Sequence, residues 1–224
     1  AAAGFPNFPP CEGVGGSLGI IAEVFEVSTT GSWTDFSPMA SIQFKPGDNI
    51  MYFGTISTGY KSGGFAGSQG VASAATNPVA PEDVTNYEIG FKGDFVDDTL
   101  RINASLFYMD YTDLQVVRFG PVPGSAFGTF QTTNIGSADI TGLEVDYVWQ
   151  ATDNFSLSGY YAYLDTEIEG LTLNTAAGPQ DFSGLPLRQS PEHSYSIIAN
   201  YDLDTANGAW NFRASYSFID DQFN

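Results

Sequence analysis

The chain has 224 residues, of which 42% are hydrophobic, 15% aromatic and only 15% charged, whereas soluble domains typically carry about 25% charged residues. Its formal net charge of -19 disfavours nucleic acid and anionic surfaces as partners. No apolar run approaches the roughly 18 residues that a membrane helix requires, which excludes a helical membrane protein.

Hydrophobic and polar residues alternate with a period of two from Phe36 onward, which predicts β-strands. A first hairpin is expected to turn at residues 46–49. The second runs through residues 86–95, turns near residue 97 and returns through residues 100–108. In each strand the apolar side chains share one face.

Two more hairpins follow, one over residues 143–163 and one over residues 194–218. Eight strands of about ten residues, at ~3.3 Å per residue and tilted by about 45°, would cross the ~25 Å apolar band of an outer membrane. Long connections alternate with the short turns, an asymmetry typical of outer-membrane barrels. These connections are expected from about 61 to 84, 112 to 138 and 166 to 192.

The predicted fold class is therefore all-β, a transmembrane antiparallel β-barrel in which residues 36–224 form the barrel segment. Residues 1–35 are expected to form an extracellular loop or a partial strand. The sequence begins without a signal peptide, so an exported protein starting here would be cleaved or truncated. A soluble β-sandwich remains an alternative, because its strands would show the same alternation.

Five segments resemble, in the same order, the barrel domain of TonB-dependent outer-membrane receptors. They are YKSGGF at residues 60–65, APEDVTNYEIGFK at 80–92, LFYMDYTDLQV at 106–116, NIGSADITGLEVD at 134–146 and FSGLPLRQSPEHS at 182–194. The glycines of these motifs suit strand exits, bulges and close backbone approaches.

The resemblance implies an arc of about eight or more strands from a barrel of about 22 strands, located in the outer membrane of a Gram-negative bacterium. It also implies an N-terminal plug and a contact with the TonB complex, both upstream of residue 1, and closing strands downstream of Asn224. The expected function is energised uptake of a large scarce nutrient, with a ferric siderophore as the commonest substrate class. Outer-membrane lipid and lipopolysaccharide would surround the barrel.

Charged side chains on the polar side of the strands are expected to face the lumen and the plug, because each would cost about 2 to 4 kcal/mol near the membrane midplane on the lipid side. Ligand contacts are expected from the extracellular loops, whose aromatic rings could stack on a siderophore or a sugar, or pack against one another. The expected lumen residues are Glu88, Lys92, Asp94, Arg101, Glu144, Asp146 and Arg213. The expected ligand-binding residues are Tyr60, Lys61, Phe65, Arg118, Phe119, Phe127 and Phe130.

No catalytic, metal or cofactor site is predicted. His193 is the single histidine and resembles a strand-start residue, and Glu167 with Glu169 fits a solvated acidic rim better than a cation site. The calcium-loop pattern over residues 202–213 and the phosphate-loop pattern over residues 13–18 both lack required positions. An enzyme is therefore not expected.

Two other functions remain open. Eight strands can close into a small structural barrel or a passive outer-membrane channel, and a β-sandwich could serve as a secreted adhesin. If the chain is instead an arc of a larger barrel, its outer strands would present unpaired edges, and it would be stable only within the full barrel.

Overall fold

The computed structural model describes residues 28–65, 76–121, 128–175 and 178–222. These residues form one large antiparallel sheet and two small two-stranded sheets. No helix among them is long and apolar enough to cross a membrane. The predicted all-β, antiparallel fold is confirmed.

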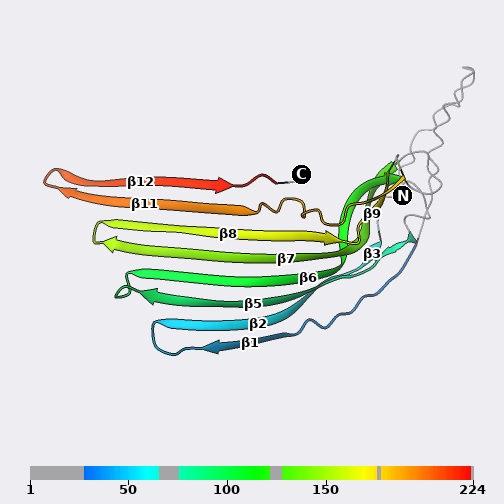
Figure 1. Ribbon diagram of the computed structural model, residues 1–224, viewed down its shortest axis with the longest axis horizontal. Helices are drawn as coiled ribbons and strands as arrows, with labels where there is room; N and C mark the ends of the chain where they lie inside the picture. Colours follow the sequence, from blue (N-terminus) through cyan, green and yellow to red (C-terminus); the bar gives the residue numbers. More distant parts are fainter. Residues whose placement is uncertain (1–27, 66–75, 122–127, 176–177, 223–224) are drawn as a thin grey trace, which may run out of the picture.

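Eight strands make up the main sheet, and each lies beside its neighbour in chain order, as Figure 1 shows. The small sheets are formed by β3 (Gly64–Phe65) with β4 (Pro78–Val79) and by β9 (Thr172–Thr175) with β10 (Gly178–Asp181). The main strands are β1 (Met39–Phe44), β2 (Ile50–Lys61), β5 (Glu82–Phe95), β6 (Leu100–Pro121), β7 (Gly128–Thr152), β8 (Phe155–Glu169), β11 (His193–Thr205) and β12 (Gly208–Ile219).

Short turns join the strands at one end of the sheet and long connections join them at the other (Figure 1). All four predicted hairpins are present. In the turn between β5 and β6, Val96, Asp97 and Asp98 adopt φ values of 55°, 52° and 64°, the left-handed conformation that tight hairpin turns require. The sequence pattern had placed this turn correctly.

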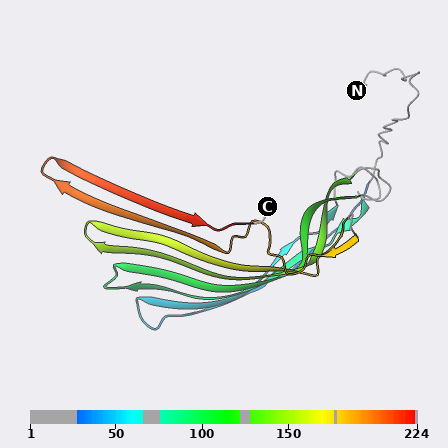
Figure 2. The ribbon, with the colours of Figure 1, turned by 45° about the horizontal axis from the view of Figure 1, so that its top comes forward.

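The connection between β6 and β7 differs from its prediction as a long loop over residues 112–138. Both strands continue well beyond the main sheet, pairing from Leu114 with Ile135 to Pro121 with Gly128. They form a curved arm that projects from the loop end of the sheet (Figures 1 and 2). Asp113, with a φ of 53°, lies opposite Gly136 at the base of this arm. Residues 118–121 and 128–130 are therefore strand residues.

The two faces of the main sheet differ in chemistry, and directly paired residues share a face. On the apolar face, Ile89 pairs with Leu106, which pairs with Leu143. On the polar face, Lys92 pairs with Asn103, which pairs with Asp146. Large side chains on the apolar face are exposed; the side chain of Ile89, for example, is 62% exposed. A soluble domain would cover such a surface.

Buried apolar side chains gather at the loop end of the sheet rather than along the strands. In the described part of the chain they are Val79, Ile135, Ala138 and Ile168. The sheet curves as a single layer (Figure 2), and its order places β1 and β12 at opposite edges. The eight strands of the main sheet therefore neither close into a barrel nor stack as a sandwich.

Candidate functional site

The motifs at the loop end of the sheet converge around Asn134 in β7. The Ala80 N–H donates to Asn134 Oδ1 at 2.8 Å, and Asn134 Nδ2 donates to the carbonyls of Ala80 at 3.0 Å and Asp113 at 2.7 Å. The Asn134 side-chain amide thus forms hydrogen bonds with both the N–H and the carbonyl of Ala80, as the backbone of a neighbouring strand would. It ties the segment before β5 to the base of the β6–β7 arm.

Gln115 in β6 adds a second set of bonds at the same place. Its side-chain nitrogen donates to the carbonyls of Ser62 at 3.1 Å and Ala80 at 2.9 Å. Its backbone N–H donates to Glu82 Oε2 at 2.6 Å, and that carboxylate also lies 3.8 Å from Lys61 Nζ. We call Lys61, Glu82, Gln115 and Asn134 the motif clasp, because they join the first four family-like motifs.

Gly63 occupies a position in this region that has no room for a side chain. A Cβ there would lie 2.4 Å from the Val79 carbonyl oxygen and 2.5 Å from Trp33 Nε1. Beside it, Phe65 packs edge-on against Trp33, with ring centroids 5.7 Å apart. The YKSGGF motif therefore fixes the exit of β2 against β4 and the segment before β1.

The fifth motif folds back along the end of β8. Gly184 N–H donates to the Ile168 carbonyl, and Ile168 N–H donates to the Leu185 carbonyl, at 2.8 and 2.9 Å. At the edge of this segment, Asp181 accepts from both the N–H and the hydroxyl of Ser183 at 2.9 and 2.6 Å. The bonds from the Ser183 hydroxyl and then from its N–H lower the pKa of the Asp181 carboxyl at the end of β10.

The predicted ligand-binding residues fall into separate places. Tyr60 lies at the end of β2 on the apolar side of the sheet, whereas Lys61 lies on the polar side with Glu82. Phe65 packs against Trp33. Arg118 and Phe119 belong to β6, where they pair with Gln131 and Phe130 of β7, and Phe127 lies outside the described residues. The structure thus does not gather these residues at one site: Lys61 belongs to the clasp, and Arg118, Phe119 and Phe130 belong to the arm.

All seven predicted lumen residues lie on the polar face. Asp94 and Arg101 are direct partners joined by two bonds, Arg101 Nε to Oδ1 at 2.6 Å and Nη2 to Oδ2 at 3.2 Å. Asp146 accepts from Asn103 Nδ2 at 2.8 Å. The polar-face residues are Glu88, Lys92, Asp94, Arg101, Glu144, Asp146 and Arg213.

A shallow polar hollow lies on this face over β1, β2, β5, β6 and β7. Its volume is about 400 Å³, and its charged lining consists of Glu88, Lys92, Glu144 and Asp146. Three carboxylates surround one ammonium, so the hollow carries a local negative charge. It favours a cationic or hydrogen-bond-donating neighbour.

Sequence reasoning missed the clasp residues Asn134, Gln115 and Glu82. Their side chains bond backbone groups up to 54 positions away along the chain, and such pairs leave no periodic signal. The one signal in the sequence was an amide or carboxylate side chain near the end of a predicted strand.

Residues 14–224 match the family model described as TonB dependent receptor-like, beta-barrel. The chain is 28% identical over 137 residues to the "Probable TonB-dependent siderophore receptor PiuA" of Acinetobacter baumannii, covering 58% of this chain and 17% of that protein. It is 31% identical over 109 residues to the pesticin receptor of Yersinia enterocolitica, covering 49% of this chain and 15% of the receptor.

Among solved structures, the ferric yersiniabactin uptake receptor FyuA from Yersinia pestis superposes with a TM-score of 0.62 at 20% identity. The match covers 81% of this chain and 25% of FyuA. At 20% identity this similarity shows a shared fold and no more. The chain spans about a quarter or less of each of these relatives.

Proposed function

Because the chain belongs to the TonB-dependent receptor β-barrel family, we propose that it forms part of an outer-membrane receptor for the uptake of a large, scarce solute of the ferric siderophore class. The family consists of receptors and transporters of the Gram-negative outer membrane. The observation that carries the proposal is the family match over residues 14–224, and the two-faced sheet supports it.

In this proposal the apolar face contacts outer-membrane lipid and lipopolysaccharide. The polar face, including the hollow lined by Glu88, Lys92, Glu144 and Asp146, contacts a plug domain contributed by residues outside this chain. Contact with TonB would also come from outside it. Directing the polar face toward a hydrated lumen avoids the free-energy cost of placing its charges in lipid.

We place the ligand contacts on the β6–β7 arm and on the polar side of the clasp. Phe119 and Phe130, which are paired across the arm, would present aromatic rings to a ring-containing chelate, whereas Arg118, on the opposite face of the ribbon, would present a cation to an anionic group. Phe127 would add a further ring, and Lys61 a second cation. Tyr60 and Phe65 would hold the base of this region. The edge-on packing of Phe65 against Trp33 supports a structural role for Phe65 rather than a ligand contact.

Uptake of ⁵⁵Fe-siderophore by iron-limited cells tests the proposal. Deleting the gene is expected to reduce uptake to background, and so is deleting tonB, while a plasmid copy should restore it in the first strain only. If solute flux through the protein persists without tonB, the protein is a passive channel and the proposed function is wrong.

A further inference from the structure

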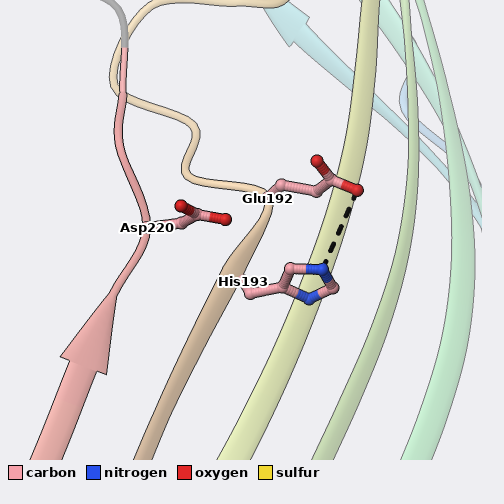
Figure 3. A group of neighbouring side chains, drawn as sticks. All are labelled: Glu192, His193 and Asp220. Carbon is pink, nitrogen blue, oxygen red and sulfur yellow. Dashed lines mark ion pairs between the residues drawn. The ribbon is translucent and has the colours of Figure 1, made fainter.

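Three potential metal ligands meet where β11 begins and β12 ends, away from both the motif clasp and the polar hollow. One ligand atom from each of Glu192, His193 and Asp220 lies within 4.8 Å of the other two. His193 Nε2 is 3.8 Å from Glu192 Oε1. Figure 3 shows Glu192 and Asp220 approaching from the two sides of the hairpin, with the imidazole near both.

The hairpin itself brings His193 and Asp220 together. Its register pairs Thr205 with Gly208 and continues to Ser194 with Ile219, so the next opposed pair is His193 and Asp220. The Asp220 N–H donates to the His193 carbonyl at 2.9 Å, which extends the ladder to this pair. The backbone therefore holds two of the three groups in a fixed relation.

The imidazole is oriented by tyrosines from β8. His193 Nδ1 is hydrogen-bonded to the Tyr161 hydroxyl at 3.0 Å, and the ring packs against Tyr163 with centroids 5.3 Å apart. A partner on Nδ1 fixes the ring and leaves Nε2 for another bond, the arrangement that protein metal sites use to set a ligating histidine. Nε2 is the nitrogen on the carboxylate side.

We propose that Glu192, His193 and Asp220 bind a divalent transition-metal ion, with Zn²⁺ the best match. An imidazole with two carboxylates suits Zn²⁺ better than Ca²⁺ or Mg²⁺, which take oxygen ligands. Bonds of about 2.0 to 2.2 Å place the ligand atoms of a tetrahedral ion closer together than they lie here. Glu192 is exposed and His193 and Asp220 are partly so, so small side-chain rotations close the site. The three residues leave a fourth coordination position unfilled.

Such an ion would connect the end of the loop after β10 to the end of β12. Leu164 N–H donates to the Glu192 carbonyl at 2.9 Å, so the bridge would extend to β8 as well. It would also offset the repulsion between two neighbouring carboxylates in a chain with a net charge of -19. The proposal is independent of the transported ligand.

Equilibrium dialysis with Zn²⁺ on the full-length protein in detergent tests the site. Relative to the wild type, His193→Asn and Asp220→Asn are each expected to lose one bound ion, or to bind it at least tenfold more weakly. Tyr161→Phe should weaken binding by about tenfold, the scale of losing an outer-shell partner. Co²⁺ absorption should report nitrogen and oxygen ligands and change in His193→Asn.

Asp221→Asn is the matched control, because it removes the same charge from the neighbouring position, outside the ligand cluster. It should bind Zn²⁺ like the wild type. Heat-modifiable electrophoresis verifies that each variant is folded. The proposal is overturned if His193→Asn and Asp220→Asn retain wild-type binding, or if Asp221→Asn loses as much as Asp220→Asn, which would indicate diffuse attraction of cations.

Discussion

Replacing Gly63 with alanine is expected to increase the rate of tryptic cleavage after Lys61 by at least about fivefold. The added Cβ would lie 2.4 Å from the Val79 carbonyl oxygen, a backbone atom that can move only if the β3–β4 pairing shifts. Overpacking of a buried position typically costs about 1 to 3 kcal/mol, and about 1.4 kcal/mol corresponds to a factor of ten in the open population. Cleavage rates follow that population when reclosing is fast.

Gly64→Ala provides the control within the same motif. No atom lies within 4 Å of a Cβ at Gly64, so this variant should be cleaved at the wild-type rate. Rates are measured on the full-length protein in detergent by following the new N-terminus at Ser62. Equal rates for both variants would mean that Gly63 is not confined as described.

Replacing Ile89 with arginine is expected to block folding into the membrane. Ile89 lies in the middle of β5, 62% exposed on the apolar face, and pairs with Gly54 and Leu106. An arginine on the lipid side near the membrane midplane costs about 2 to 4 kcal/mol. The compact band in unheated electrophoresis should therefore be strongly reduced after refolding into lipid vesicles.

Glu88→Arg is the matched control, one position away on the polar face. It places the same side chain on the polar face, in the hollow that Glu144 and Asp146 also line, so the folded fraction should stay near that of the wild type. If Glu88→Arg reduced folding as strongly as Ile89→Arg, the assignment of the two faces would be wrong.

The hairpins were predictable because one-sided burial leaves a period of two in the sequence. The Asp97–Asp98 turn and the alternation around Ile89 show this directly. The β6–β7 arm was not predictable, because its strands project beyond the sheet and polar residues such as Thr132 and Thr133 interrupt the pattern. A paired ribbon without a clear period of two is predicted as a loop.

The site residues were harder to predict from the sequence than the strands. Alternation alone assigns the charged residues to the polar face. It does not predict the hydrogen bonds between the Asn134 side chain and the backbone of Ala80. His193 is the single histidine, so the sequence alone does not predict a metal site there. Its neighbour Asp220 follows from the hairpin register, so extending the turn at residues 206–207 outward would have located the pair.

The most direct test of the account is the polarity on each side of β5. Single cysteines at residues 87, 88, 89, 91 and 92, in the full-length protein with Cys11→Ser, are labelled with bimane in lipid vesicles, and the emission maximum is recorded at each position. Position 90 is left as glycine, because a Cβ there would lie 2.4 Å from the Ala104 carbonyl oxygen. Blue-shifted emission at 87, 89 and 91, with red-shifted emission at 88 and 92, is the predicted result. An emission maximum that does not alternate, or alternates in the opposite phase, would contradict a barrel with its apolar face in lipid.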